Sequence, residues 1–257
     1  MISPLRRLFF RSDRTRALAG WLNGWLHPER RLALGHLAFF HEEEALGPIQ
    51  REEALLLFAL VRVLRPALVV ELGFHRGHSA LNFVAALDPG ARLVSFDIAE
   101  SARELAEGYL GGLPGFRYIH KSQTDLSASD FDGQKIDLVL LDAAHDVELN
   151  QRAYRALEPC LAPGAVIAVH DTGVWQRSTM RPSHHERARE RPAGWFDAEQ
   201  YQPWPEERQF VNWLRQAHPE LAQLHLHSER TVRHGLTLLQ RSEALPIAAP
   251  GDGPSGT

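Results

Sequence analysis

The chain has 257 residues, a formal net charge of −4 and 44% hydrophobic residues, which suits one large α/β domain with additions. The pI near 6.4 argues against nucleic acid as the main partner. A single cysteine, Cys160, excludes an internal disulfide and suits a reducing compartment, so we predict a cytoplasmic protein.

Residues 1–46 are predicted to form an N-terminal helical extension. Arginines alternate there with large apolar side chains as far as Leu18. No apolar run of about 18 residues accompanies them, so we expect neither a secretion signal nor a membrane span. An amphipathic basic stretch can lie on an anionic membrane, but it more commonly packs on its own domain or on a second subunit. A homodimer is therefore compatible with the sequence.

The main domain is predicted over residues 47–242. It begins with a helix over residues 50–64, which Gly47 and Pro48 introduce. We place five apolar side chains on the inner face of this helix: Leu55, Leu56, Phe58, Ala59 and Val63. The helix leads directly into the most informative segment of the sequence.

That segment, RPALVVELGFHRGHS at residues 65–79, indicates a buried strand, a glycine turn and a helix. Glu71 interrupts the apolar strand, so its carboxylate should lie near the strand end and accept a hydrogen bond. Gly73 and Gly77 would let the backbone approach a bound molecule, to which the helix starting near Ser79 offers its amides. An ordinary strand-to-helix turn is the alternative explanation of the same residues.

Short strands and helices then alternate along the chain. Further helices are predicted over residues 79–87, 101–110, 147–161 and 208–218, and strands over 92–97, 116–120, 136–142, 165–170, 221–228 and 235–241. Together with the strand at 68–72, this pattern predicts an α/β fold with a doubly wound, mostly parallel seven-stranded sheet and one antiparallel C-terminal strand. We expect the last two strands to form the only antiparallel pairing.

Acidic residues follow three of these strands. Asp97, Asp142 and Asp171 each close an apolar run, and Glu71 adds a fourth carboxylate. The carboxyl ends of parallel strands meet at one edge of a sheet, where open α/β sheets bind ligands. One such acid could be a helix cap, but four in register predict a binding site.

Two stretches fall outside the alternation. Residues 174–207, with four prolines and three tryptophans, are predicted to be a lid or active-site loop, because long connections in compact domains are usually functional. Residues 243–257 have little to bury and are predicted to be a disordered tail.

Three motifs in this order resemble the class I S-adenosylmethionine-dependent methyltransferases: ELGFHRGHS, the FD that ends at Asp97, and LLDAAHDVELNQRAYRALEPCLAPGAVIAVHDT. Within that class the chain is similar to bacterial small-molecule O-methyltransferases related to the macrocin and cephamycin-pathway enzymes. The resemblance spans residues 47–172 and, more loosely, HGLTLLQ. It implies a Rossmann-like methyltransferase fold. It also implies methyl transfer from S-adenosylmethionine to a hydroxyl of a small molecule, such as a sugar, a natural product or a phenol.

The resemblance implies that Glu71 reaches the cofactor's ammonium directly or through water and that Asp97 accepts from both ribose hydroxyls. Asp97 ends the strand after the glycine turn, where a ribose-binding carboxylate is expected. Ser122 and Gln123 match positions that contact adenine, although an ordinary polar loop would explain them equally well. The cofactor-binding candidates are Glu71, Gly73, Phe74, Gly77, Ser79, Asp97, Ile98, Ser122, Gln123 and Asp142.

The chemistry is predicted at Asp142, His145, His170 and Asp171. Methyl transfer to a hydroxyl needs a deprotonated attacking oxygen, which a divalent ion and a nearby base can provide. The resemblance implies that Asp142, His170 and Asp171 hold magnesium or manganese and that His145 is the base. His170 departs from the acidic pair of the metal-dependent enzymes. The site could therefore use two carboxylates plus water, prefer manganese or iron, or hold no metal, and either histidine could be purely structural.

Other classes of protein explain the motifs less well. A nicotinamide dehydrogenase would normally show G-x-G-x-x-G, whereas this turn has only Gly73 and Gly77. A serine hydrolase built on Ser79 would lack the second glycine of G-x-S-x-G. A catalytically inactive methyltransferase-like protein that binds the cofactor or a partner stays open. The absence of an acid at His170 favours it, and His145 argues against it.

Overall fold

The computed structural model describes residues 22, 36, 49–173, 206–226 and 235–241. Apart from Leu22, His36, Glu206 and Glu207, the predicted N-terminal extension, lid and C-terminal tail lie outside the described residues. The chain divides into two compact units, Met1–Ala38 and Phe39–Thr257, and the fold below is that of the second. None of the described helices is long and apolar enough to cross a membrane.

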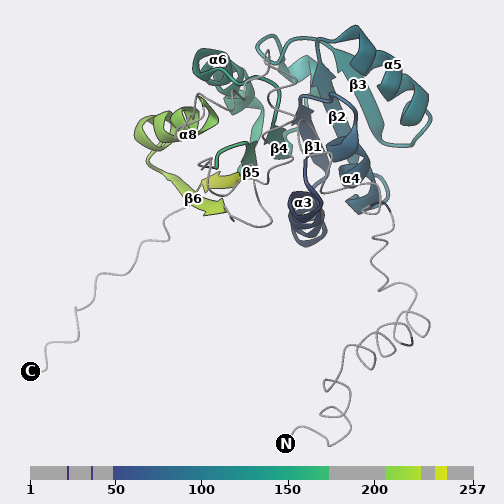
Figure 1. The fold of residues 1–257 in the computed structure, drawn as a ribbon, viewed down its shortest axis with the longest axis horizontal. Helices are drawn as coiled ribbons and strands as arrows, with labels where there is room; N and C mark the ends of the chain where they lie inside the picture. The colour runs from purple at the N-terminus through teal and green to yellow at the C-terminus, as the bar shows by residue number, and fades with distance from the viewer. Residues whose placement is uncertain (1–21, 23–35, 37–48, 174–205, 227–234, 242–257) are drawn as a thin grey trace, which may run out of the picture. The chain divides into compact units, whose positions relative to one another are not determined.

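Seven strands form one sheet in the order β3-β2-β1-β4-β5-β7-β6 (Figure 1). They are β1 (Leu68–Leu72), β2 (Arg92–Asp97), β3 (Phe116–His120), β4 (Ile136–Leu141), β5 (Leu161–His170), β6 (Leu221–Leu226) and β7 (Leu236–Arg241). Strands β1 to β5 pair in parallel. This arrangement confirms the predicted Rossmann-like sheet.

Strand β7 is antiparallel to both of its neighbours, β5 and β6. The prediction of one antiparallel strand is confirmed, but the prediction of one antiparallel pairing is wrong. After β6 forms the edge of the sheet, the chain reverses and β7 fills the position between β6 and β5. Both edges of β7 therefore carry antiparallel hydrogen bonds.

The described helices are α3 (Arg51–Leu64), α4 (His78–Ala86), α5 (Glu100–Tyr109), α6 (Val147–Leu157) and α8 (Glu206–Ala217), with 3₁₀ turns η3 (Ala128–Phe131) and η4 (Glu158–Cys160). Helix α3 contacts α4, and α6 contacts α8. In the main hydrophobic core, β1 residues Leu68 and Leu72 join Tyr154 of α6 and Phe210 of α8. Since successive strand residues face opposite sides, Glu71 points to the other face of the sheet.

One predicted boundary moved by several residues. The helix expected over 147–161 ends at Leu157, followed by η4, and β5 begins at Leu161 instead of residue 165. Pro159 has no N–H to continue the α-helical ladder, which accounts for the early end. β5 pairs with β4 at Leu161 and again from Val166 to Val169, and Pro163 and Gly164 lie between these pairs, where the register shifts.

The predicted inner face of α3 is largely wrong. Of the five side chains placed there, Phe58 is buried, but Leu55 is 45% exposed and Val63 is 79% exposed. The buried stripe consists of Glu53, Ala54, Leu57, Phe58 and Val61. Apolar side chains occur almost all round this helix, so hydrophobicity alone did not determine its rotation. The rotation that the structure shows places the carboxyl group of Glu53 in the buried stripe.

Candidate active site

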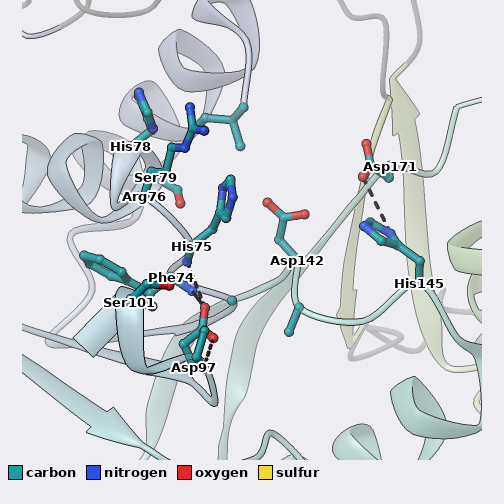
Figure 2. A pocket seen from close by; sticks show the side chains of 15 residues that line it. Phe74, His75, Arg76, His78, Ser79, Asp97, Ser101, Asp142, His145 and Asp171 are labelled. Carbon is teal, nitrogen blue, oxygen red and sulfur yellow. Dashed lines mark hydrogen bonds and ion pairs between the residues drawn. The ribbon is translucent and has the colours of Figure 1, made fainter. Parts of the chain in front are cut away.

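Two adjoining cavities lie at the carboxyl edge of the sheet. The larger has a volume of about 290 Å³ and the smaller about 110 Å³, and both are lined by Gly73, Asp97 and Ala143. Charged or titratable side chains line the larger one: His75, Arg76, His78, Asp97, Asp142, His145 and Asp171. In Figure 2, Asp142 lies between the side chains of the glycine turn on one side and His145 and Asp171 on the other. Four predicted site residues therefore lie together at the carboxyl edge of the sheet: Asp97, Asp142, His145 and Asp171.

Asp97, at the end of β2, anchors the glycine turn. Its Oδ2 accepts hydrogen bonds from the backbone N–H groups of Phe74 (3.0 Å) and His75 (2.8 Å). Its Oδ1 accepts one from the N–H of Ala99 (2.9 Å). A carboxylate offers about four acceptor positions, so about one is left for a ligand. Asp97 therefore has less capacity for two ribose hydroxyls than the sequence suggested.

Glu71 is fully buried within β1 and does not line either cavity. Ser95 Oγ donates to its Oε2 over 2.5 Å, while Oε1 has no hydrogen-bond partner among the described residues. Burial raises the pKa of Glu71 to about 8, against the lowering effect of hydrogen bonds from Ser79 and Ser95. A carboxyl group that is mostly protonated at neutral pH is a poor countercharge for an ammonium. The expected direct contact with the cofactor is not supported.

The glycines of the turn serve internal packing. A Cβ on Gly73, whose φ is +99°, would overlap the carbonyl oxygen of Asp142. A Cβ on Gly77, whose φ is +78°, would lie 2.6 Å from the Phe74 ring. Phe74 is buried against Tyr118, with ring centroids 5.6 Å apart. The glycines let the turn pack tightly on itself and on the end of β4. Gly73 also lines both cavities, and its approach to a ligand stays a prediction.

The smaller cavity contains the residues predicted to contact adenine. Ile98, Ser122 and Gln123 line it together with Asp97. Gln123 is 7% exposed, and its Oε1 has no hydrogen-bond partner among the described residues. Its Nε2 lies 3.5 Å from Asn150 Oδ1, at the limit of a hydrogen bond. A buried amide oxygen without a donor indicates that a ligand donor can bind there.

Asp142, His170 and Asp171 converge where β4 and β5 end. Their ligand atoms lie within 4.8 Å of one another. His170 Nδ1 lies 3.1 Å from Asp142 Oδ1 and 3.4 Å from Asp171 Oδ1. His170 is only 2% exposed and lies behind the cavity wall that the two carboxylates form. The parallel pairing of β4 with β5 brings these residues together as predicted.

His170 contacts a third carboxyl group on its other side. Its Nε2 lies 2.9 Å from Oε2 of Glu53 in α3. Burial alone would lower the pKa of His170, but Asp142, Asp171 and Glu53 together raise it well above its ordinary value. The three carboxyl groups therefore favour the charged imidazole in the ligand-free protein, in which both nitrogens can donate.

His145 contacts two carboxyl groups through Nδ1. One is Glu207 Oε1, at hydrogen-bonding distance, and the other is Asp171 Oδ2 at 3.8 Å. Burial alone would lower the pKa of His145, but the hydrogen bond with Glu207 and the charge of Asp171 raise it to about 9. At neutral pH the ligand-free protein therefore holds mainly an imidazolium here, whereas a general base must be neutral. His145 lies where it was predicted, but its imidazole does not have the neutral charge state that a general base needs.

The comparison with protein families identifies the central part of the fold. Residues 70–172 match the family model described as a methyltransferase domain. Residues 70–172 therefore form a methyltransferase domain. The predicted class of enzyme, an S-adenosylmethionine-dependent methyltransferase, is thereby confirmed. A comparison with curated protein sequences yields no match.

Solved structures share the fold of this methyltransferase domain and of its flanking elements. A candidate caffeoyl-CoA O-methyltransferase from Staphylococcus aureus aligns with TM-score 0.58 and 14% identity, covering 87% of this chain and 99% of the other. The O-methyltransferase TomG from Streptomyces achromogenes, in complex with S-adenosylmethionine, aligns with TM-score 0.53 and 18% identity over 86% and 95%. An O-methyltransferase from Bacillus cereus, in complex with S-adenosylhomocysteine, aligns with TM-score 0.53 and 14% identity over 87% and 97%. At these identities the likeness concerns the fold.

Sequence reasoning missed several residues of the methyltransferase site. Glu53 had a signal, since it lies one helical turn before Leu57 and two before Val61 on the buried stripe. Glu207 is the last residue of the Pro- and Trp-rich segment and lies in a charged run, and no pattern linked it to His145. His75, Arg76 and His78 were quoted as part of the turn motif, but nothing assigned them to a cavity wall.

Proposed function

We propose that this protein transfers a methyl group from S-adenosylmethionine to a hydroxyl of a small molecule. One observation carries the proposal: two cavities that share Asp97 adjoin within a methyltransferase domain, and the larger is lined by Asp142, His145 and Asp171. The O-methyltransferases that share the fold support a hydroxyl acceptor. A sugar, a natural product and a phenol are the acceptor classes that we propose.

The cavities fit the two ends of the cofactor. Gln123 Oε1 in the smaller one is an acceptor without a donor, which suits the amino group of adenine. Asp97 lies at the junction, where it can accept one ribose hydroxyl. In the larger cavity, Ser79 and the amides at the start of α4 can bind the carboxylate of the methionine group. When bound, the cofactor supplies the electrophilic methyl group.

The residues at the ends of β4 and β5 fit a divalent cation. Neighbouring ligands on an octahedral ion with bonds of about 2.1 Å lie about 3 Å apart. The separations of His170 Nδ1 from the carboxylate oxygens of Asp142 and Asp171, 3.1 and 3.4 Å, are close to that value. Asp142, His170 and Asp171 would hold manganese or magnesium once His170 Nδ1 has released its proton, and the ion would lower the pKa of a bound hydroxyl.

His145 is the residue that we propose to remove the proton of the acceptor. It lies in the wall of the larger cavity, where Glu207 holds its Nδ1. A base oriented through its other nitrogen by a carboxyl group follows the pattern of catalytic histidine pairs. To act as a base, His145 must be neutral, so its raised pKa has to fall when the cofactor and acceptor occupy the site.

A second candidate function is binding without catalysis. Both ring nitrogens of His170 contact carboxyl groups, so a charged His170 can compensate the acidic cluster without a cation. A protein that binds S-adenosylmethionine but methylates nothing would have this arrangement. Turnover on any hydroxyl acceptor would exclude it.

Several finer features stay predictions. They are the likeness to macrocin- and cephamycin-pathway enzymes, a homodimer, a cytoplasmic location and the domain limits 1–46, 47–242 and 243–257. Within the domain predicted over residues 47–242, we propose that residues 174–207 close over the acceptor.

Mass spectrometry of the protein purified without added ligand tests the proposed function. Retained S-adenosylhomocysteine, followed by formation of methylated product from a panel of hydroxyl compounds, is the expected result. Retained or preferentially bound nicotinamide dinucleotide would contradict the class of cofactor. Cofactor binding with no product from any acceptor would favour the non-catalytic function.

Asp97→Ala is expected to weaken binding of S-adenosylmethionine by roughly 1.5 to 3 kcal/mol, the scale for hydrogen bonds to a charged group. The variant loses the ribose acceptor and also three backbone hydrogen bonds that hold the turn. Asp97→Asn keeps one side-chain oxygen and should lose less. Calorimetric titration measures both affinities, and thermal unfolding reports damage to the turn. Unchanged affinity in Asp97→Ala would remove Asp97 from the site.

A further inference from the structure

Glu53 is a fully buried acidic residue that the expected chemistry does not use. It is the third residue of α3, and its Oε2 accepts a hydrogen bond from the backbone N–H of Gln50 at 2.9 Å. That contact completes a capping box, which a solvent-exposed glutamate forms equally well. Capping alone therefore does not explain why this side chain is directed into the interior, where a carboxyl group is costly to bury.

The reason for its burial is His170. Glu53 Oε2 also lies 2.9 Å from His170 Nε2, although 117 residues separate the two in the sequence. An ionised carboxylate can only accept, so Nε2 donates in this contact when Glu53 is charged. Glu53 thus holds the ring in one orientation, with Nε2 toward α3 and Nδ1 toward Asp142 and Asp171.

This orientation has a defined chemical consequence. A histidine that binds a metal through one ring nitrogen usually donates the other N–H to a carboxylate or carbonyl, which fixes the tautomer and raises the basicity of the ligand. The contacts of Glu53, His170 and Asp142 follow this order: carboxyl group, imidazole, then the acidic cluster. A nitrogen ligand beside two carboxylates is unusual for magnesium, which binds oxygen, and suits manganese or iron better.

We propose that Glu53 is a positioning residue that presents His170 Nδ1 as a nitrogen ligand beside Asp142 and Asp171, and that the site consequently prefers Mn²⁺ or Fe²⁺ to Mg²⁺. This inference rests on the divalent cation of the proposed function. Helix α3 precedes the first strand of the sheet, so the selectivity of the site depends on a helix that contributes no ligand itself.

Binding of Mn²⁺ to the purified full chain tests the inference without any activity measurement. Titration followed by electron paramagnetic resonance should show one bound ion, and its pulsed spectrum should show coupling to one imidazole nitrogen. Glu53→Gln should weaken Mn²⁺ binding about 10- to 100-fold, the usual effect of losing such a carboxylate partner. Glu52→Gln is the matched control, because it removes the same charge from the same turn of α3 at a residue that is not fully buried. Its affinity should equal that of the wild type.

His170→Asn links the effect of Glu53 to the histidine. It replaces the nitrogen ligand by an amide, so the nitrogen coupling should disappear and the Mn²⁺ to Mg²⁺ affinity ratio should fall. Adding Glu53→Gln to this variant should change Mn²⁺ affinity by less than about 3-fold, because Glu53 would act only through His170. A full 10- to 100-fold loss in this background would overturn the positioning role.

Wild-type protein alone is decisive if Glu53→Gln does not fold. Bound Mn²⁺ without nitrogen coupling, or no Mn²⁺ binding at all, would overturn the inference. Methyl transfer together with equal Mn²⁺ affinity in wild type and Glu53→Gln would reject the role of Glu53 and leave the proposed function intact. Nitrogen-coupled Mn²⁺ that depends on Glu53, without methylation of any acceptor, would reject the proposed function and leave the inference intact.

Discussion

Asp142→Ala is expected to abolish methyl transfer together with cation binding. Asp142 is the first of the three residues whose ligand atoms converge within 4.8 Å, and it lies in the wall of the larger cavity. Without its carboxylate, His170 Nδ1 faces Asp171 alone. Two ligands, both almost fully buried, should not retain a divalent ion against water. Rates of methyl transfer and calorimetric titration with Mn²⁺ measure the two losses.

The same experiment separates the roles of the cation and the protein. A chelator should abolish the activity of the wild type, and added Mn²⁺ should restore it at least as well as Mg²⁺. Neither ion should restore Asp142→Ala, whereas Asp142→Asn, which keeps an oxygen ligand, should regain part of its activity at high Mn²⁺ concentration. Full activity of the wild type in chelator would exclude the cation and leave the chemistry to His145.

His145→Ala is expected to lower kcat about 10²- to 10⁴-fold, the usual contribution of a general base. Its side chain lines the cavity but is not among the three converging ligand residues, so the variant should bind cofactor and Mn²⁺ as the wild type does. Added imidazole should restore part of the rate, because a small base can occupy the vacated space. Rescue of this kind would not be expected if His145 only stabilised the fold.

Glu207→Gln is the companion variant. It keeps a hydrogen-bond acceptor for His145 but removes the charge that contributes to the raised pKa of the histidine. We expect a smaller loss of kcat than in His145→Ala, with unchanged affinity for the cofactor. A fully active His145→Ala would assign the proton to another acceptor and leave the cation as the only activating group.

Much of the binding edge could be predicted because it follows from local pattern. Asp97, Asp142 and Asp171 each end an apolar run, and parallel strands align such ends at one edge. Ser122 and Gln123 follow β3 in the same way and line the smaller cavity, and their contact with adenine stays a prediction. A strand fixes the position of the residue that follows it, so spacing in the chain was sufficient.

Other features depended on the rotation of an element about its axis. Helix α3 has apolar side chains in nearly every direction, so its sequence permits more than one buried stripe. Packing against α4 and the contact with His170 of β5 selected the stripe that contains Glu53. The surroundings of Glu71 could not be predicted either, because the charge pattern did not reveal its hydrogen bonds with Ser79 and Ser95.

The sequence by itself determined the class of fold, the methyltransferase domain and the edge of the sheet where the two cavities lie, since periodicity and strand-end residues are local properties of the chain. The tertiary structure alone decided which carboxyl group each histidine contacts. Glu53 is 117 residues from His170, and Glu207 is 62 residues from His145. Contacts over such separations form only when whole helices pack in one rotation and register, and no local pattern records that choice.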